Sequence, residues 1–136
     1  VKIVLKRSLQ WLPILGQGMK LLDFIFVHRN WERDRVKFLR RVKRISHASN
    51  PYALIVFPEG TTITPKSKAK SDAFAAKNNF KPFQHVLLPR TTGLLAAVET
   101  LSDTFDGILD VTMAFSGMPP EAVPEEHYTL GSILYG

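Results

Sequence analysis

Short apolar runs alternate along this chain with segments of helical pattern, and this alternation limits the fold more than any other feature of the sequence. Judged by their apolar content and by the residues that bound them, strands are expected at residues 24–27, 53–57, 86–88 and 108–115. Helices are expected at residues 19–22, 31–48, 71–77 and 92–101. Strands that alternate with helices are typical of an α/β fold, so we expect a mostly parallel sheet flanked by helices.

The clearest helical signal lies at residues 31–48. Asn30 is of a type that caps helix N-termini, and Glu32 and Asp34 place negative charge in the first turn, where the helix dipole favours it. An apolar stripe at helical spacing is formed by Phe38, Leu39, Val42 and Ile45. Basic residues occupy the other faces of this helix. A solvated surface is the favoured interpretation of those faces, and contact with anionic lipid is the alternative.

Other segments give weaker signals. Residues 1–10 mix apolar and basic side chains at helical spacing, and residues 53–57, closed by Pro58, look like a central strand covered on both faces. Residues 66–79 are expected to begin as a loop before their helix, and residues 117–126, with three prolines, to be a loop. Core packing is favoured over contact with a membrane interface for Trp11, Leu12, Ile14, Leu15 and Met19.

Length and composition set outer limits. With 136 residues and 45% hydrophobic content, the sequence has the composition of a single globular domain or part of one. The absence of cysteine excludes disulfides, cysteine-ligated zinc and a cysteine nucleophile within this sequence. No apolar run approaches the roughly 18 residues that span a bilayer. Because the sequence starts at Val1 rather than at Met and stops at Gly136 without a clear final element, we expect it to be part of a longer protein.

Charge is unevenly distributed along the sequence. Residues 1–50 hold 12 Lys and Arg against 3 Asp and Glu (+9), whereas residues 51–136 hold 6 against 9 (−3). A basic half favours an anionic partner, which leaves nucleic acid, an anionic membrane and a phosphorylated substrate as classes. Nucleic acid is disfavoured, because the sequence shows neither an aromatic platform nor a recognition-helix pattern.

Two polar turns follow expected strands. In a parallel sheet, ligands gather at the carboxyl ends of the strands. Residues 58–62 and 89–93 fall at such ends. In the first turn, Glu59 supplies a carboxylate, Gly60 permits close backbone approach and Thr61 adds a hydroxyl. A ligand-binding turn and a solvated turn both fit this composition.

The same turns carry a family resemblance. Val56-Phe57-Pro58-Glu59-Gly60-Thr61 resembles the third sequence block of the lysophosphatidic acid acyltransferase, or PlsC-like, superfamily. Phe26-Val27-His28-Arg29 resembles the second block and Val86-Leu87-Leu88-Pro89 the fourth, in the family's order. Between residues 6 and 117 the sequence is most similar to the lysocardiolipin and lysophosphatidylinositol acyltransferase branch. That likeness is carried by residues 26–31, 66–71 and 88–93.

The resemblance implies the PlsC-like α/β fold and acyl transfer from acyl-CoA to the free hydroxyl of a lysophospholipid. It implies acyl-CoA as a co-substrate, with no further cofactor and no metal. Residues 1–136 would be the substrate-binding portion of a partial acyltransferase domain that lacks its N-terminal part, and residues 118–136 a C-terminal loop and the start of a further segment. An intracellular membrane, the endoplasmic reticulum or alternatively a mitochondrial membrane, is the implied setting.

The resemblance also implies roles for particular residues. Arg29 would bind the substrate phosphate, for which a planar guanidinium is suited. Glu59 would orient Arg29 or accept a hydrogen bond from a glycerol hydroxyl, and Gly60 and Thr61 would add donors. Pro89 would shape the acyl or CoA side. Contacts to a headgroup or to CoA are expected from Lys66, Lys68, Lys70 and Arg90, with a solvated loop as the alternative for the lysines.

The sequence departs from the family pattern at two points. The family's catalytic His-x4-Asp motif does not occur in it, so no catalytic residue is expected within this sequence, the motif is expected upstream of Val1, and the chain alone is expected to be inactive. Asp34 lies one position too far from His28, which is therefore interpreted as structural or substrate-adjacent. Thr62 stands where many relatives carry Arg. A non-catalytic protein of the same fold that binds anionic lipid is the alternative function.

Overall fold

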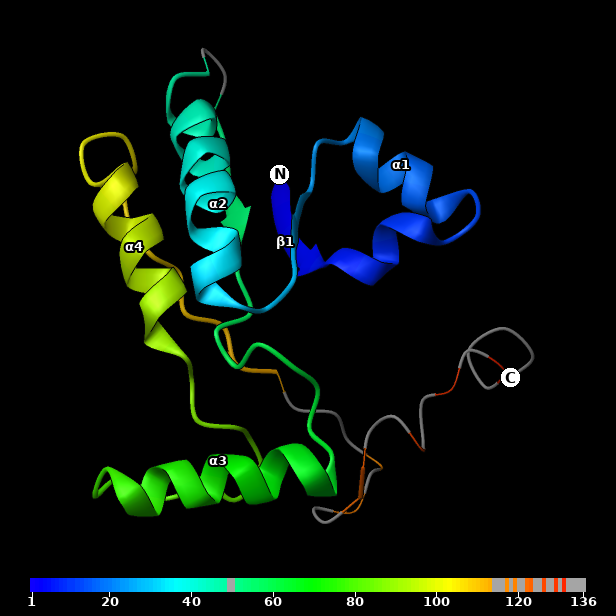
Figure 1. Ribbon diagram of the computed structural model, residues 1–136, viewed down its shortest axis with the longest axis vertical. Helices are drawn as coiled ribbons and strands as arrows, with labels where there is room; N and C mark the ends of the chain where they lie inside the picture. Colours follow the sequence, from blue (N-terminus) through cyan, green and yellow to red (C-terminus); the bar gives the residue numbers. More distant parts are fainter. Residues whose placement is uncertain are drawn as a thin grey trace. The chain divides into compact units, whose positions relative to one another are not determined.

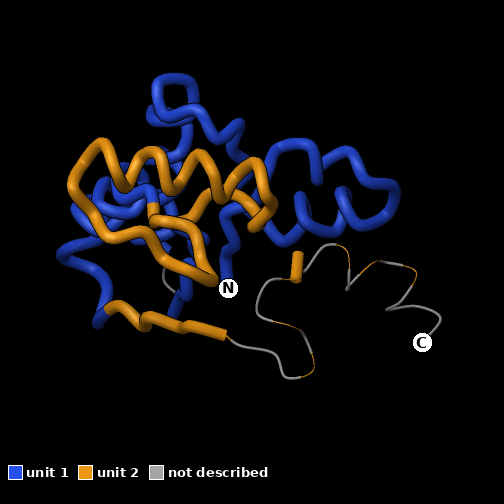
Figure 2. The backbone as a smooth tube through the Cα atoms, turned by 90° about the horizontal axis from the view of Figure 1, so that it is seen from below, with its two compact units in different colours: residues 1–58, 90–107 blue, residues 59–89, 108–136 orange. Residues whose placement is uncertain are grey.

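The computed structural model describes residues 1–48 and 51–113, together with residues 117, 119, 122, 123, 126, 129 and 131 (Figure 1). The chain divides into two units, drawn in different colours in Figure 2. The first comprises Val1–Pro58 and Arg90–Gly107, and the second comprises Glu59–Pro89 and Ile108–Gly136. The segment Glu59–Pro89 is thus an insertion between two parts of the first unit. The residues that flank it, Pro58 and Arg90, lie next to each other, because the backbone N–H of Arg90 donates to the carbonyl of Pro58 (2.7 Å).

A three-stranded parallel sheet forms the centre of the first unit. Its strands are β1 (Lys2–Lys6), β2 (Ile25–Val27) and β3 (Leu54–Ile55), in the order β2-β1-β3. Val4 lies opposite Ile25, and Lys2 lies opposite Leu54. The prediction of an α/β fold with a parallel sheet is confirmed, and so is the strand expected near residues 24–27.

The sequence pattern predicts the wrong structure for the central strand. Residues 1–10 were expected to be helical, and that expectation is wrong: they form β1 and the start of the 3-10 helix η1 (Arg7–Trp11). The apolar stretch Ile3-Val4-Leu5 suits a strand that has neighbours on both sides. Paired residues lie 21 positions apart for Val4 and Ile25 and 52 positions apart for Lys2 and Leu54, so local spacing gives no sign of these neighbours.

The strand expected at residues 53–57 is also different from the prediction. Only Leu54–Ile55 are extended and paired, and β3 lies at an edge of the sheet rather than at its centre. Leu54 packs against the core, whereas Ile55 is 40% exposed and Phe57 is 58% exposed. Alternate side chains of a strand point to opposite faces, and only one of these faces is covered by the described part of the unit.

Helix α2 (Trp31–Ser46) follows the prediction closely, ending slightly before residue 48. The Asn30 side chain caps it, since its Oδ1 accepts from the backbone N–H of Arg33 (3.1 Å). Helix α4 (Thr91–Leu101) confirms the helix expected at residues 92–101, and α1 (Leu15–Leu21) contains most of the short helix expected at residues 19–22. The residue before each of these helices has a non-helical backbone, so the helical hydrogen bonds start after it.

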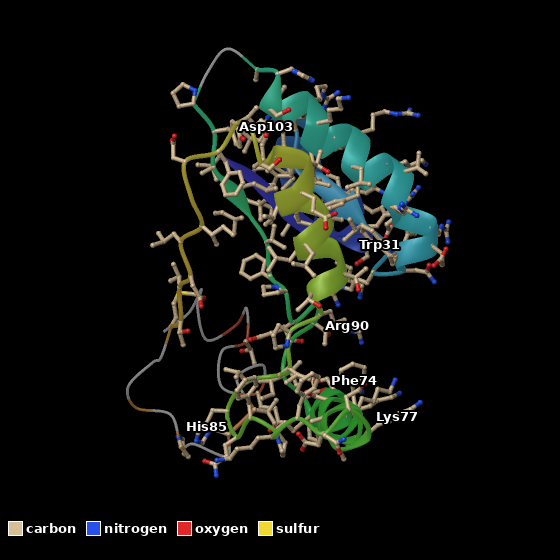
Figure 3. The ribbon with its side chains drawn as sticks, turned by 90° about the vertical axis from the view of Figure 1, so that its left-hand side faces the viewer. Trp31, Phe74, Lys77, His85, Arg90 and Asp103 are labelled. Carbon is tan, nitrogen blue, oxygen red and sulfur yellow. The ribbon has the colours of Figure 1, made fainter. Side chains whose placement is uncertain are left out.

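The core lies between the sheet and the pair α2 and α4, which lie on the same side of it in Figure 1. Trp31 packs edge-on against Phe38, with ring centroids 6.3 Å apart, and closes the core near the start of α2 (Figure 3). The apolar stripe predicted on α2 is therefore the face that packs on the sheet. The fully buried members of this core are Ile25, Phe38, Val42, Ile45, Ala97 and Leu101.

The apolar residues between η1 and α1 do not pack in this core. Trp11 is 72% exposed, Ile14 87% and Leu15 66%, and Leu12 is exposed as well. Only Met19 of this set is half-buried. The favoured expectation of core packing for this segment is wrong, because the core of the described first unit is built from α2, α4 and the sheet and includes none of these side chains.

The second unit contains helix α3 (Pro65–Lys77). The expectation of a loop over residues 66–70 is wrong, because the helix begins at Pro65. Thr64 and Ser67 form a reciprocal capping box, and a proline at the first helical position is pre-set for helix. Residues 86–88 form no strand: Leu87 is buried, and the backbone N–H of Leu88 donates to the Ser71 hydroxyl (2.8 Å) in place of a neighbouring strand.

The strand expected at residues 108–115 is absent from 108–113, where Ile108 and Leu109 are 65% and 87% exposed. The part of the second unit that the structure describes offers these residues no strand to pair with. Residues 114 and 115 lie outside the described residues. Half of the expected loop at 117–126 and most of the further segment at 118–136 lie outside them too, so both stay predictions.

We predict that Val42→Ala destabilises the first unit by about 1.5–3 kcal/mol, because two methyl groups leave a fully packed site. Val42 is 0% exposed, whereas Val36 on the same helix is 67% exposed. Val36→Ala is therefore the matched control, with an expected change within about 0.5 kcal/mol. The free energy of unfolding is measured in urea. Equal effects of the two substitutions would contradict the packing described for α2.

Candidate functional site

A cavity of about 170 Å³ lies in the first unit beside strand β2. Arg7 follows the end of β1 and His28 follows the end of β2, so the cavity reaches the carboxyl ends of two parallel strands. It is smaller than the roughly 300–1,000 Å³ of a typical small-molecule site, so its size suits a small polar group. Its lining comes from η1, from α2 and from β2 and the residue after it: Arg7, Gln10, Ile25, Phe26, Val27, His28, Asp34, Lys37, Phe38 and Arg41.

A histidine–aspartate pair forms one wall of the cavity. Nδ1 of His28 lies 2.8 Å from Oδ1 of Asp34, and Oδ2 of Asp34 accepts from the backbone N–H of Asn30 (3.2 Å). Asp34 is 8% exposed. Arg29, with φ of 65°, lies in the left-handed region and reverses the chain between His28 and the first turn of α2. This turn brings together two residues whose spacing in the sequence had argued against a pair.

Asp34 is held in its ionised form. Burial by itself would raise the pKa of Asp34, but hydrogen bonds from the backbone and ring of His28 and from the backbone of Asn30 lower the pKa below its ordinary value of 3.8. A carboxylate only accepts hydrogen bonds, so Nδ1 of His28 carries the proton that joins the pair. The other ring nitrogen, Nε2, is left to accept from a ligand when the ring is neutral or to donate to one when it is charged.

Three cationic side chains face the same cavity: Arg7, Lys37 and Arg41. Nη1 of Arg41 donates to Oδ1 of Asp23 (2.8 Å) and to the carbonyl of Phe24 (3.3 Å), which fixes its position. Asp23 also binds Arg44 and lies 3.6 Å from Lys2. Positive charge exceeds negative charge around the cavity, so the arrangement can bind an anion.

Asp23 and Asp34 bracket β2 and α2. Asp23 precedes β2 and binds the second half of α2, whereas Asp34, at the start of α2, binds His28 just after β2. Burial would raise the pKa of Asp23, but Arg44, Arg41 and Lys2 together lower it below 3.8. The two carboxylates thus fix the helix along the strand, and with it the lining of the cavity.

Arg29 and the turn at Glu59 belong to different units. Arg29 is exposed in the loop between β2 and α2, and it is its neighbour His28 that lines the described cavity. In the second unit Gly60 has φ of 73°, which glycine adopts without strain, and the turn that it ends contains Glu59. Burial raises the pKa of Glu59. Thr61 is half-buried beside it.

The remaining predicted contacts lie on α3 and before α4. Lys66 and Lys70 are exposed one helical turn apart, and Nζ of Lys68 lies 2.6 Å from both carboxylate oxygens of Asp72. Lys68 is therefore engaged within its own helix. Pro89 is exposed, and Arg90 is the residue before the first turn of α4 (Figure 3).

Among the described residues, no three His, Asp or Glu side chains come close enough together to hold a metal ion. No helix in this part of the chain combines the length and the apolar character that crossing a bilayer requires.

Comparison with known proteins identifies the family. Residues 1–116 match the family model Acyltransferase, so the chain belongs to this family, and the resemblance drawn from the sequence blocks is confirmed. The chain is 38% identical to lysocardiolipin acyltransferase 1 of Danio rerio over 98% of its own length and 34% of the relative's. No solved structure matches it.

Two further relatives carry other acceptor names. The chain is 33% identical to 2-acyl-1-lysophosphatidylinositol acyltransferase of Saccharomyces cerevisiae, over 98% of its own length and 42% of the relative's. It is 30% identical to 1-acyl-sn-glycerol-3-phosphate acyltransferase 2 of Brassica napus, over 86% of its own length and 30% of the relative's. The chain thus spans well under half the length of these relatives.

Sequence reasoning missed most of the cavity. Arg7, Lys37 and Arg41 were included only in the general count of basic residues, and Asp34 was assigned to the helix dipole. One signal was available for the histidine–aspartate pair. Asn30 marks the helix start, so Asp34 falls in the first turn, close in space to the residues just before the cap.

We predict that Asp34→Asn lowers the free energy of unfolding by about 1–3 kcal/mol at pH 7, since a hydrogen bond to a charged group is lost. The folded-state pKa of Asp34 lies below 3.8, so its contribution is present above that pH and disappears as the pH falls through the folded-state value. The difference between wild type and variant should therefore shrink below about pH 3.8. Urea unfolding at several pH values measures it.

Glu32→Gln is the control for this prediction, because Glu32 lies exposed in the same first turn of α2. It removes one negative charge near the helix start without touching His28, and we expect a change within about 0.5 kcal/mol. A deficit of Asp34→Asn that stays constant down to pH 2 would show that the ionised carboxylate is not what stabilises this turn.

Proposed function

We propose that this chain is the substrate-binding part of an acyl-CoA-dependent O-acyltransferase whose acceptor is a lysophospholipid. One observation carries the proposal. Relatives named for lysocardiolipin, for lysophosphatidylinositol and for 1-acylglycerol-3-phosphate all match over most of this chain. Each of these names denotes a phosphate-bearing glycerolipid with a free hydroxyl, so a phosphorylated acceptor is the chemistry that they share. The acyl-CoA donor is the further part of the proposal.

The cavity in the first unit supports the phosphate part of this proposal. Arg7, Lys37 and Arg41 supply positive charge, and the volume of about 170 Å³ admits a phosphate group but little more. Ion pairs and charge-assisted hydrogen bonds from arginine and lysine are the usual means of holding phosphate. His28 is proposed to contact the substrate through Nε2, with Asp34 as the residue that positions its ring.

The proposed reaction moves an acyl group from the thioester sulfur of acyl-CoA to a hydroxyl oxygen of the acceptor. The acceptor hydroxyl oxygen forms a bond to the thioester carbonyl carbon, the carbon–sulfur bond breaks, and CoA leaves as a thiol. A general base takes the hydroxyl proton and returns it to the sulfur. Because this sequence contains no His-x4-Asp motif, we assign the base to residues outside these 136, and we propose that the chain alone does not turn over.

The predicted residues of the second unit are proposed to complete the acceptor site. Arg29 of the first unit and the turn at Glu59, Gly60 and Thr61 would converge on the phosphorylated glycerol in the assembled enzyme. The raised pKa of Glu59 fits a carboxyl group that is partly removed from water and able to bond a hydroxyl. We propose that Pro89 shapes the acyl or CoA side, and that the headgroup or CoA is contacted by Lys66, Lys68, Lys70 and Arg90.

The same chemistry sets the location of the enzyme. Lysophospholipids with long acyl chains reside in membranes, so we propose that the protein works at an intracellular membrane surface. The endoplasmic reticulum is our first assignment, and a mitochondrial membrane is the alternative.

We predict that Lys37→Gln in the full-length protein lowers kcat/KM for the lysophospholipid by about 10- to 100-fold, the value of a hydrogen bond to a charged group. The KM for acyl-CoA should not change. Initial rates at varied acceptor with saturating acyl-CoA measure the first quantity, and rates at varied acyl-CoA with saturating acceptor measure the second. Lys43→Gln is the matched control, because Lys43 is exposed on the same helix and is not part of the cavity lining. Equal effects of the two substitutions would contradict the assignment of this cavity.

We predict that Arg29→Gln and Glu59→Gln are coupled in the full-length enzyme. If both groups contact one phosphorylated glycerol, the double variant should lose less activity than the two single losses combined, by about 0.5–3 kcal/mol in transition-state free energy. A double-mutant cycle on kcat/KM for the acceptor measures the coupling. Simple additivity would contradict their convergence on one ligand and leave the cavity assignment standing.

A further inference from the structure

The η1–α1 hairpin, residues 7–22, projects from the first unit on the side away from α2 and α4 (Figure 1). Its two short helices are held together by close backbone contact. The backbone N–H of Gly16 donates to the carbonyl of Leu12 (2.9 Å), and a Cβ at Gly16 would lie 2.4 Å from the carbonyl oxygen of Gln10. Glycine is therefore required there, and the hairpin has a defined shape.

Apolar side chains cover the surface of this hairpin. Four of them lie at the turn between the two helices and two lie at the end of α1, and exposed apolar side chains that group together mark interaction surfaces. The exposed fractions are 72% for Trp11, 41% for Leu12, 87% for Ile14, 66% for Leu15, 88% for Leu21 and 58% for Leu22.

The tip of the hairpin is strained as well as apolar. The backbone N–H of Leu15 donates to the carbonyl of Pro13 (2.6 Å) around Ile14, whose φ and ψ are 60° and −61°. This is a γ-turn of the rare, strained hand, and a β-branched residue at positive φ is a real outlier. The turn places a large apolar side chain in water at a conformational cost, which does nothing for the packing of the described core. An apolar environment outside the unit would explain it.

The charge of the segment identifies that environment. Residues 1–22 contain four basic residues (Lys2, Lys6, Arg7 and Lys20) and no Asp or Glu. Nζ of Lys20 lies 5.0 Å from the ring centroid of Trp11, which combines an amphipathic aromatic ring with a cation. Tryptophan and lysine together are typical of side chains at a membrane interface. A second copy of the hairpin would bring the same positive charge and be repelled.

We propose that the η1–α1 hairpin docks the protein on an anionic bilayer, with Ile14 and its apolar neighbours inserted about 5–10 Å into the boundary between headgroups and acyl chains. Arg7 belongs to η1 and also lines the cavity described above. Docking would therefore hold the cavity at the headgroup layer, where the phosphate of a membrane lipid lies. The inference rests on the proposed function only for this last step.

Tryptophan fluorescence tests the docking directly, because the chain has only two tryptophans, Trp11 on the hairpin and Trp31 in the core. In the Trp31→Phe variant only Trp11 reports, and in Trp11→Phe only Trp31 reports. With vesicles of phosphatidylcholine and about 30% phosphatidylserine that carry brominated acyl chains, Trp11 should be quenched and Trp31 should not. Quenching of both to the same extent, or of neither, would overturn the proposal.

Ile14→Asn tests the contribution of the tip. Asparagine accepts positive φ more readily than isoleucine, so the urea midpoint should stay equal or rise. Vesicle binding, measured by sedimentation with the same vesicles, should weaken about tenfold, because less apolar area is inserted into the bilayer. Leu95→Gln is the control, because Leu95 is 55% exposed on α4 and should leave binding unchanged. An equal loss from Val36→Asn, on the basic helix α2, would assign the docking to that helix and overturn this one.

The outcome is separable from that of the proposed function. Acyl transfer in the full-length protein is assayed with a short-chain lysophospholipid that is monomeric in solution. Unchanged kcat/KM in Ile14→Asn together with lost vesicle binding supports docking as a step distinct from catalysis. Vesicle binding without any acyl transfer by the full-length protein would defeat the proposed function and leave the docking surface in place. Acyl transfer without Trp11 quenching would support the proposed function and overturn the docking surface.

Discussion

The packing of α2 along strand β2 determines most of what the first unit can do. Val42, which is 0% exposed in the core that also contains Ile25 of β2 and Ala97 of α4, fixes the rotation of the helix about its own axis. Once the apolar stripe faces the sheet, the positions of the polar residues between its members follow from the helical period. Asp34, Lys37 and Arg41 then lie at the edge of the core and line the cavity, at intervals of three or four residues.

Two carboxylates fix this arrangement from either end of β2. Asp23, which precedes the strand, forms ion pairs with Arg41, Arg44 and Lys2. Asp34 binds His28, the residue that follows the strand. Both have a pKa below the ordinary value, so both are charged at neutral pH. The exposed cluster at Asp23 is weakened by solvent screening, whereas the pair at Asp34 is buried and better shielded. The end of β2 that carries His28 is thus the more firmly organised one.

The first unit combines two surfaces with different chemistry. The cavity is cationic and small, and the hairpin beside it is apolar and exposed. Arg7 belongs to both, because η1 starts directly where β1 ends. The proposed function uses both features, the cavity to bind a headgroup and the hairpin to hold the protein at the membrane surface. Their adjacency follows from a single short connection in the chain.

Local sequence determined the elements whose residues interact with near neighbours. Helix α2 could be predicted with its cap because Asn30, the acidic first turn and the apolar stripe all lie within one segment, and α4 and β2 were recognisable on similar grounds. The sequence blocks around His28, Glu59 and Pro89 also identified the family, which the match over residues 1–116 confirms. Patterns of this kind depend on spacing along the chain alone.

Tertiary structure decided everything that depends on partners far apart in sequence. Lys2–Lys6 became the central strand because β2 and β3 pair with it from both sides, and Leu54–Ile55 remained an edge for lack of a second neighbour in the described sheet. The approach of Asp34 to His28 needed the left-handed turn at Arg29. The exposure of Ile14 follows from the fold of the η1–α1 hairpin, whose tip lies outside the core that α2 and α4 form with the sheet. Apolar content indicates that a side chain is suited to burial, but only the folded chain determines which surfaces remain to bury it.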